Sequence, residues 1–259
     1  MEKFRTLIIP DVHGRDFWRE PVNETLENSD ARIIFLGDYV DPYPYEWENV
    51  MEAPSRIDFK QKAFDTLVEV IELKKKYPKR ITLLLGNHDY GYINDRVCSC
   101  RRDSKRYVDI HKVFMENRDC FLLADEERVN DKHIIYSHAG ISKKYAQLCF
   151  GDIVNEDNVV DLFNNAYLTK DDKILRTLEI YDYYRGWGGD AYASLVWADV
   201  REWETDEENE DAQSGYGYMI FGHSQLENEP IIGKHVADLD CRKAFILDDE
   251  GNIKEYLKD

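Results

Sequence analysis

The stretch Ile81-Thr82-Leu83-Leu84-Leu85-Gly86-Asn87-His88-Asp89 decides the fold, because an apolar run of strand length ends in a turn that carries an amide, an imidazole and a carboxylate. A short apolar run bounded by turn residues predicts a buried strand. The same pattern recurs at four other places: residues 7–9 precede Asp11-Val12-His13-Gly14, residues 33–36 precede Gly37-Asp38-Tyr39-Val40-Asp41, residues 134–136 precede Ser137-His138-Ala139-Gly140, and residues 218–221 precede Gly222-His223-Ser224. The sequence therefore predicts a series of buried strands that each end in a polar turn.

Helical patterns lie between these strands. Residues 58–76 carry apolar side chains near helical spacing until Pro78 ends the pattern, and residues 143–185 look helical and polar. Residues 235–239, 244–247 and 253–257 read as further strands, the last two joined as a hairpin by the turn at residues 248–252. Alternating strands and helices predict a layered α/β domain. We expect one domain over residues 1–259, with a helical insertion at about 143–190 and an acidic surface loop at about 202–214.

Composition limits the kinds of protein this can be. The chain has 259 residues, 43% of them hydrophobic, and a formal net charge of −18. No apolar run reaches the roughly 18 residues of a membrane span, and no signal peptide pattern opens the chain. Five cysteines at irregular spacing suit reduced thiols. We therefore expect a soluble cytoplasmic protein without a membrane partner, and the acidic charge argues against a nucleic acid polymer as partner.

The polar turns concentrate the chemistry of the chain. Four of its seven histidines, His13, His88, His138 and His223, lie in them. Ligand sites of α/β sheets form outside the carboxyl ends of the strands, so these turns should converge. Imidazole, carboxylate and amide groups suit divalent transition metals. Each motif alone could equally be a capped turn or a strand end with a buried histidine, and the metal interpretation depends on all five together.

With these motifs in place, the chain resembles the calcineurin-like metallophosphoesterases, and within them the phosphoprotein phosphatase branch. Tyr92-Ile93-Asn94 and Val196-Trp197-Ala198-Asp199 also match segments of that branch. The resemblance implies a four-layer α/β/β/α sandwich of two mixed β-sheets. It further implies two divalent metal ions, with Asp11 and His13 binding one, Asn87, His138 and His223 the other, and Asp38 bridging both. A metal-bridging hydroxide would attack the phosphorus, His88 would protonate the leaving oxygen as the general acid, and Asp41 would orient His88.

The chain departs from that branch in its arginines. The family holds the substrate phosphate with arginines at the positions of Pro42 and Leu85, and a third has no clear counterpart here. A basic run follows His88 and could replace them, with Arg96 and Arg101 as candidate phosphate contacts. The same run could instead be a solvated surface that pairs with nearby acids.

The leading hypothesis is a manganese-dependent hydrolase of phosphomonoesters, with a small molecule or a phosphoprotein as substrate. Iron or zinc would also suit the ligands. The aromatic segments Pro42-Tyr43-Pro44-Tyr45-Glu46-Trp47 and residues 183–189 could stack a base, which favours a nucleotide hydrolase as the alternative. An alternative of another class is a non-catalytic metal-binding scaffold. The sequence alone leaves the physiological substrate and the oligomeric state open.

Overall fold

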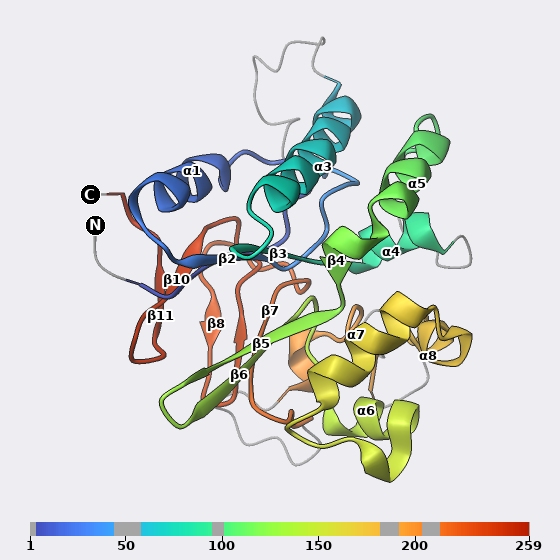
Figure 1. The fold of residues 1–259 in the computed structure, drawn as a ribbon, viewed down its shortest axis with the longest axis vertical. Helices are drawn as coiled ribbons and strands as arrows, with labels where there is room; N and C mark the ends of the chain where they lie inside the picture. Colours follow the sequence, from blue (N-terminus) through green and yellow to red (C-terminus); the bar gives the residue numbers. More distant parts are fainter. Residues whose placement is uncertain (1–3, 44–57, 95–100, 182–191, 204–212, 259) are drawn as a thin grey trace.

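The computed structural model describes residues 4–43, 58–94, 101–181, 192–203 and 213–258 (Figure 1). Two mixed β-sheets form its centre. The first has the strand order β11-β10-β1-β2-β3-β4 and the second the order β5-β6-β7-β9-β8. The strands of the first sheet are β1 (Thr6–Ile9), β2 (Arg32–Phe35), β3 (Ile81–Leu84), β4 (Phe121–Leu122), β10 (Phe245–Leu247) and β11 (Ile253–Glu255). Those of the second are β5 (Ala124–Val129), β6 (Lys132–Ser137), β7 (Tyr218–Phe221), β8 (Ile231–Ile232) and β9 (Val236–Asp238).

Parallel pairing joins the strands that end in the polar turns. β1 pairs with β2, β2 with β3, and β6 with β7, all in parallel. The outer strands β5, β8 and β11 pair antiparallel with their neighbours, whereas the outer strand β4 pairs in parallel with β3. β10 and β11 form the expected hairpin. Parallel strands end at the same edge of a sheet, so the turns after β1, β2 and β3 are neighbours, as are those after β6 and β7.

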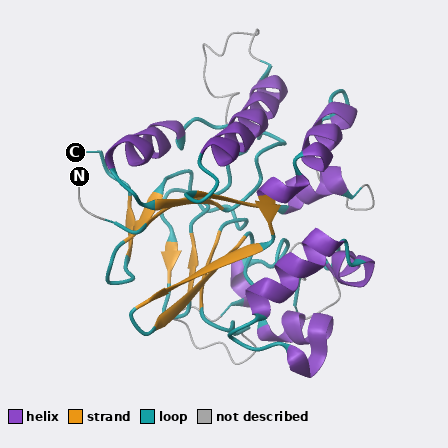
Figure 2. Cartoon of the chain, in the orientation of Figure 1, coloured by secondary structure: helices purple, strands orange, loops and turns teal. Residues whose placement is uncertain are grey.

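Helices flank both sheets (Figures 1 and 2). α1 (Arg19–Asn28), α3 (Phe59–Lys76), α4 (Asn87–Ile93) and α5 (Tyr107–Glu116) lie on the side of the first sheet. α6 (Lys143–Phe150), α7 (Val159–Thr169) and α8 (Asp172–Thr177) lie beside the second sheet. Short 3-10 turns add η1 (Arg118–Cys120), η2 (Gly151–Ile153) and η3 (Val200–Glu202).

Strand alternation divides the core into layers. Successive strand residues point to opposite faces. Ile8, Ile34 and Leu84 of the first sheet share a buried cluster with Ile134 and Ile220 of the second, which places this cluster between the sheets. Their strand neighbours belong to a second cluster that includes residues of α1 and α3: Leu7, Ile33, Leu83, Val22 and Leu67. The arrangement is the four-layer α/β/β/α sandwich expected from the resemblance.

One local expectation is confirmed, and two others need correction. The helix expected over residues 58–76 is α3, and Asp58 caps it by accepting a hydrogen bond from the Gln61 amide. β11 ends at Glu255, two residues before the predicted strand end. Glu202 was wrongly assigned to the acidic surface loop, because it is buried and accepts hydrogen bonds from the amides of Ala193 and Asp199. Residues 204–212 of that tract lie outside the described residues.

Among the described residues, no helix combines the length and the apolar character that crossing a membrane requires.

Candidate active site

Two buried carboxylates lie at the centre of the converging turns, each held by one oxygen. Asp38 Oδ1 accepts the His88 backbone N–H at 2.9 Å, and Asp11 Oδ1 accepts the His223 N–H at 3.0 Å. A glycine makes room for each contact. A Cβ on Gly86 would lie 2.0 Å from Asp38 Oδ1, and one on Gly222 would lie 2.2 Å from Asp11 Oδ1. The second oxygen of each carboxylate is thereby turned toward the imidazoles.

The imidazoles surround Asp38 from both sheets. Asp38 Oδ2 lies 3.4 Å from His13 Nε2 and 3.5 Å from His138 Nε2. His138 Nε2 lies 3.0 Å from Asn87 Oδ1 and 3.2 Å from His223 Nδ1. Asp38 therefore stands between two sets of potential ligands, as a bridging carboxylate must.

The histidines are oriented for metal binding by their other ring nitrogen. The Nδ1 atoms of His13 and His138 lie 2.7 Å and 2.9 Å from the carbonyls of Val40 and Leu36, to which they donate when protonated. Such a bond fixes the tautomer and leaves the Nε2 lone pair for a metal ion. Burial, reinforced by the charges of His88 and Arg15, holds the pKa of His13 well below its usual value. Burial likewise raises the pKa of the Asp11 and Asp38 carboxyls, with the opposing charge of His138 acting on Asp11 and that of His88 on Asp38.

These residues fit divalent cations. Ligand atoms of His13, Asp38 and His88 all lie within 4.8 Å of one another, as do those of Asp38, His138 and His223. The two groups share Asp38 and are buried. Asp11 Oδ2 lies somewhat farther out, 3.9 Å from His13 Nε2.

Backbone strain is concentrated in these turns. His13, Asp38, Asp41 and His223 all have positive φ, between 45° and 70°. Residues other than glycine rarely adopt this backbone conformation. Where they do, the residues often belong to functional sites whose surrounding structure enforces the conformation. The strain therefore marks the same turns that the sequence pattern selected.

A second group, next to the carboxylates, is a buried hydrogen-bond chain around Asp41. His88 Nδ1 lies 2.8 Å from Asp41 Oδ2, and the Tyr92 hydroxyl donates to Asp41 Oδ1 at 2.6 Å. The Tyr92 oxygen also accepts the Asp103 amide at 2.6 Å. Asp41 is thus fixed at both oxygens, and the His88 ring is oriented with Nε2 away from Asp41. Sequence reasoning included His88 and Asp41 but missed Tyr92.

Asp89 has a structural role that sequence reasoning also missed. Its carboxylate accepts the backbone N–H groups of Asp38, Tyr39 and Gly86 at 2.7 to 3.0 Å. These bonds cap α4 and join the turn after β2 to the turn after β3. Gly86 is the N-cap of α4, and Asn87, His88 and Asp89 form its first turn.

Arg101 comes from a distant segment and reaches His88. One of its Nη atoms lies 3.2 Å from His88 Nε2, and its Nε donates to the Asp41 carbonyl at 3.2 Å. Its guanidinium carbon lies 3.5 Å from the centroid of the Tyr43 ring. Lys60 of α3 donates to the backbone carbonyls of Arg101 and Arg102. These bonds hold the backbone at Arg101, which has a positive φ. Of the two arginines chosen from sequence, Arg101 lies at the site and Arg96 lies outside the described residues.

Two more arginines, not selected from the sequence, lie close by. Arg15 is buried and donates to the Asp11 carbonyl at 3.0 Å. Arg201 forms a two-point ion pair with Asp199, at 2.7 Å and 2.9 Å, and both line a pocket of about 370 Å³ with Tyr43 and His223. The signal for Arg15 was its place directly after Asp11-Val12-His13-Gly14.

A further carboxyl close to Asp11 is that of Asp240, which is also buried. Its pKa is raised by burial and by the charge of Asp11.

Comparisons with known proteins define the class. Residues 4–226 match the calcineurin-like phosphoesterase family, and the chain belongs to this family of metal-dependent phosphoester hydrolases. The chain is 25% identical over 249 residues to the serine/threonine-protein phosphatase 6 catalytic subunit of Drosophila melanogaster, which covers 93% of this chain and 63% of that relative. The chain thus spans less than two thirds of that relative's length.

Solved structures confirm the fold. A cold-active protein-tyrosine phosphatase of a psychrophilic Shewanella species superposes with a TM-score of 0.57 at 14% identity, over 98% of this chain and 80% of that one. A protein serine/threonine phosphatase from Saccharomyces cerevisiae gives a TM-score of 0.51 at 12% identity, over 97% and 79% of the two chains. The sequence relative is a serine/threonine-protein phosphatase, in agreement with the resemblance to the phosphoprotein phosphatase branch.

Proposed function

We propose that this protein hydrolyses phosphomonoesters with two divalent metal ions, manganese being the first to test. Asp11 and His13 would hold one ion, Asn87, His138 and His223 the other, and Asp38 both. The ions would supply an activated water and neutralise charge on the phosphoryl group. The observation that carries the proposal is the place of the Asp38 carboxylate, 3.4 Å and 3.5 Å from imidazole nitrogens of the two sheets.

His88 is assigned the leaving-group side of the reaction. Asp41 accepts from His88 Nδ1 and would stabilise the imidazolium, so that Nε2 can hand a proton to the leaving oxygen. Tyr92 keeps the Asp41 carboxylate in that orientation. The dyad is buried, which strengthens the interaction between the two groups.

Arg101 favours the monoester over the diester. A guanidinium 3.2 Å from His88 Nε2 is within reach of any phosphoryl group whose leaving oxygen lies at that nitrogen. A phosphomonoester has three non-bridging oxygens and a phosphodiester has two. If two cations were to bind one such oxygen each, only the monoester would keep a third oxygen for Arg101. Arg101 would therefore replace the arginines that the family places at Pro42 and Leu85.

The two alternatives receive less support. A nucleotide hydrolase would need a free aromatic face, and Arg101 covers one face of Tyr43. The remaining residues of the aromatic segments, within 44–57 and 182–191, lie outside the described residues. A non-catalytic scaffold would have no need of the Tyr92, Asp41 and His88 chain. We further propose that the protein acts in the cytoplasm, where Cys149 and Cys241, both buried thiols without a disulfide, would stay reduced.

The test is the ratio of kcat/KM for 4-nitrophenyl phosphate to that for bis(4-nitrophenyl) phosphate, with manganese supplied. We expect the wild type to prefer the monoester. Arg101→Ala removes a charged hydrogen bond of about 1.5–3 kcal/mol, so monoester kcat/KM should fall about 10- to 100-fold while diester turnover changes little. Lys105→Ala removes an exposed cation of the same segment and is the matched control. An equal fall in kcat/KM of Arg101→Ala on both substrates would contradict the role of Arg101. A wild-type protein that turns over neither substrate would contradict the proposed function.

A further inference from the structure

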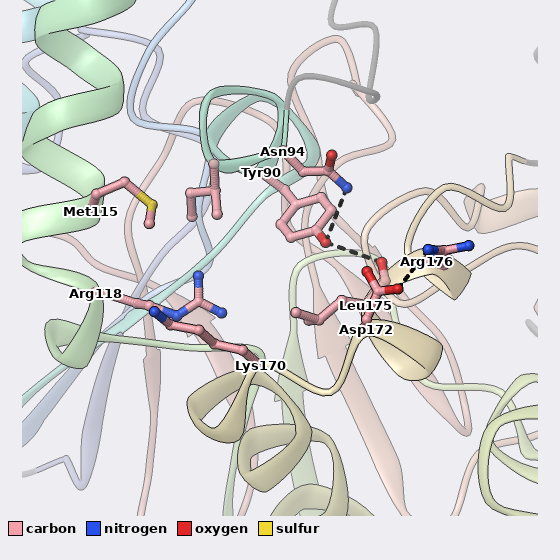
Figure 3. Close-up of a pocket in the computed structure, with 9 residues that line it drawn as sticks. Tyr90, Asn94, Met115, Arg118, Lys170, Asp172, Leu175 and Arg176 are labelled. Carbon is pink, nitrogen blue, oxygen red and sulfur yellow. Dashed lines mark hydrogen bonds and ion pairs between the residues drawn. The ribbon is translucent and has the colours of Figure 1, made fainter.

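A second pocket lies away from the carboxylates, where the helices of the two halves meet (Figure 3). Its volume is about 340 Å³, near the lower end of the usual range for small-molecule sites. α4 contributes Tyr90, and Asn94 caps the end of this helix. η1 begins with Arg118, Lys170 caps the end of α7, and α8 contributes Leu175. The pocket therefore lies between α4, the helix that begins with Asn87 and His88, and the helices beside the second sheet.

The charges in this pocket are opposite to those of the chain. Three basic residues line it against one acid, Asp172, in a protein with a formal charge of −18. Asp172 is already paired with Arg176 at 2.6 Å. Arg118 and Lys170 have no carboxylate partner among the described residues, and Figure 3 places them together on one side of the pocket, opposite Tyr90 and Leu175. Two cations without an acid make an environment for an anion.

Arg118 is held in place by contacts that leave its charge uncompensated. One Nη atom donates to the Tyr167 carbonyl at 2.7 Å, and the guanidinium carbon lies 4.1 Å from the centroid of the Tyr167 ring. Its Nε is buried and has no hydrogen-bond partner among the described residues. A guanidinium fixed in this way loses little conformational freedom when an anion binds.

The rest of the lining suits an apolar body. Met115 and Leu175 face the space in Figure 3, and Met115 is partly exposed. The Tyr90 hydroxyl is already engaged, since it donates to the Leu175 carbonyl at 3.0 Å and lies 3.4 Å from the Asn94 amide nitrogen. A ligand can therefore cover this wall without leaving its polar groups unpaired.

We propose that this pocket binds a small organic anion, with its charged groups at Arg118 and Lys170 and its apolar part against Met115 and Leu175. The ligand would join α4 to α7 and α8 and would stabilise the chain. The site is independent of the proposed catalysis, because none of its lining residues belongs to the carboxylate and imidazole cluster.

The test uses the metal-loaded full chain and naphthalene-1,5-disulfonate, a flat dianion that phosphatases do not hydrolyse. Its Kd is measured by isothermal titration calorimetry and its stabilising effect by the shift in Tm. Inorganic sulfate and naphthalene-1-sulfonate test the apolar part and the second charge separately, and both should bind more weakly. Lys170→Glu should raise the Kd for the disulfonate at least tenfold.

Two controls locate the binding. Lys144→Glu reverses the charge of an exposed lysine on α6, and Arg101→Ala alters the metal-bearing site; both should leave the Kd within about twofold of the wild-type value. The proposal is overturned if the disulfonate does not bind at millimolar concentration, if Lys170→Glu and Lys144→Glu behave alike, or if Arg101→Ala abolishes binding.

Discussion

Replacing Gly86 by alanine should displace the Asp38 carboxylate. The new Cβ would lie 2.0 Å from Asp38 Oδ1 and 2.7 Å from the Asp38 backbone nitrogen. Contacts below 3.0 Å do not occur for real Cβ atoms, so the carboxylate must move by about 1 Å or more. That movement breaks the 2.9 Å bond from the His88 N–H to Asp38 Oδ1.

The magnitude follows from these two effects. Loss of a hydrogen bond to a charged group costs about 1.5–3 kcal/mol, and forcing extra volume into a packed site costs about 1–3 kcal/mol. Together they lower the free energy of unfolding by about 2.5–6 kcal/mol. Because Asp38 is proposed to bridge both ions, metal content should fall from two ions toward none.

Gly151→Ala is the matched control. Gly151 has φ of +63° and ψ of −142°, a conformation that other residues rarely adopt, but no atom lies within 4 Å of its added Cβ, so only a conformational cost of about 1–3 kcal/mol applies. Gly86 has φ of −92°, so its cost is steric alone. Urea unfolding gives the stability, and elemental analysis after gel filtration gives the metal content. A Gly86→Ala protein with two bound ions and stability within about 0.5 kcal/mol of wild type would refute the reasoning.

Three further predictions concern the ligands, the dyad and a hairpin turn. Asp38→Asn should lose both ions by elemental analysis, whereas His13→Ala should lose chiefly one; two ions retained in the Asp38 variant would contradict the bridging role. Tyr92→Phe should lower kcat about tenfold at unchanged metal content, because Asp41 loses a charged hydrogen bond, and a fall in metal content instead would point to a ligand effect. Burial opposes the ionised Asp248, but hydrogen bonds from Asn252 and Lys254 outweigh it and lower its pKa to about 2. The ionised carboxylate therefore stabilises the folded state at pH values above 3.8, the pKa of this group in the unfolded chain. This stabilisation is lost as the pH falls from 3.8 through the folded-state pKa of about 2. Asp248→Asn should thus be less stable than wild type at pH 7, with a difference in urea unfolding that shrinks near pH 2; a constant difference would contradict it.

The fold was largely predictable because its central strands are apolar on both faces. β1, β2 and β3 are buried in two clusters, one on each side of the sheet, so their sequences contain uninterrupted aliphatic runs. β5 was missed because Ala124-Asp125-Glu126-Glu127-Arg128-Val129 is an edge strand with charged side chains, one of which pairs with Arg32 of the first sheet. Its identity depends on pairing with β6, which local sequence does not encode.

The candidate site divides in the same way. Residues directly after strands could be found, because their positions follow from strand topology alone. Three other contacts depend on how a helix, a turn and a distant segment pack together, and local sequence does not predict them. They are the contact of Tyr92 with Asp41, that of Arg15 with Asp11, and that of Arg101 with the Tyr43 ring. Asp89 was visible in the motif, but its bonds to the amides of Asp38 and Tyr39 could be known only from the structure.

The hydrogen bond from His223 to Asp11 joins the two sheets across 212 positions of the chain. Contacts between residues so far apart form late in folding, because loop closure is costly before neighbouring structure exists. The two proposed groups of metal ligands around Asp38 therefore cannot be assembled on a nascent chain that lacks β7. During refolding, binding of the proposed second ion should coincide with the final cooperative phase. Chelators added before that phase should therefore leave its rate unchanged.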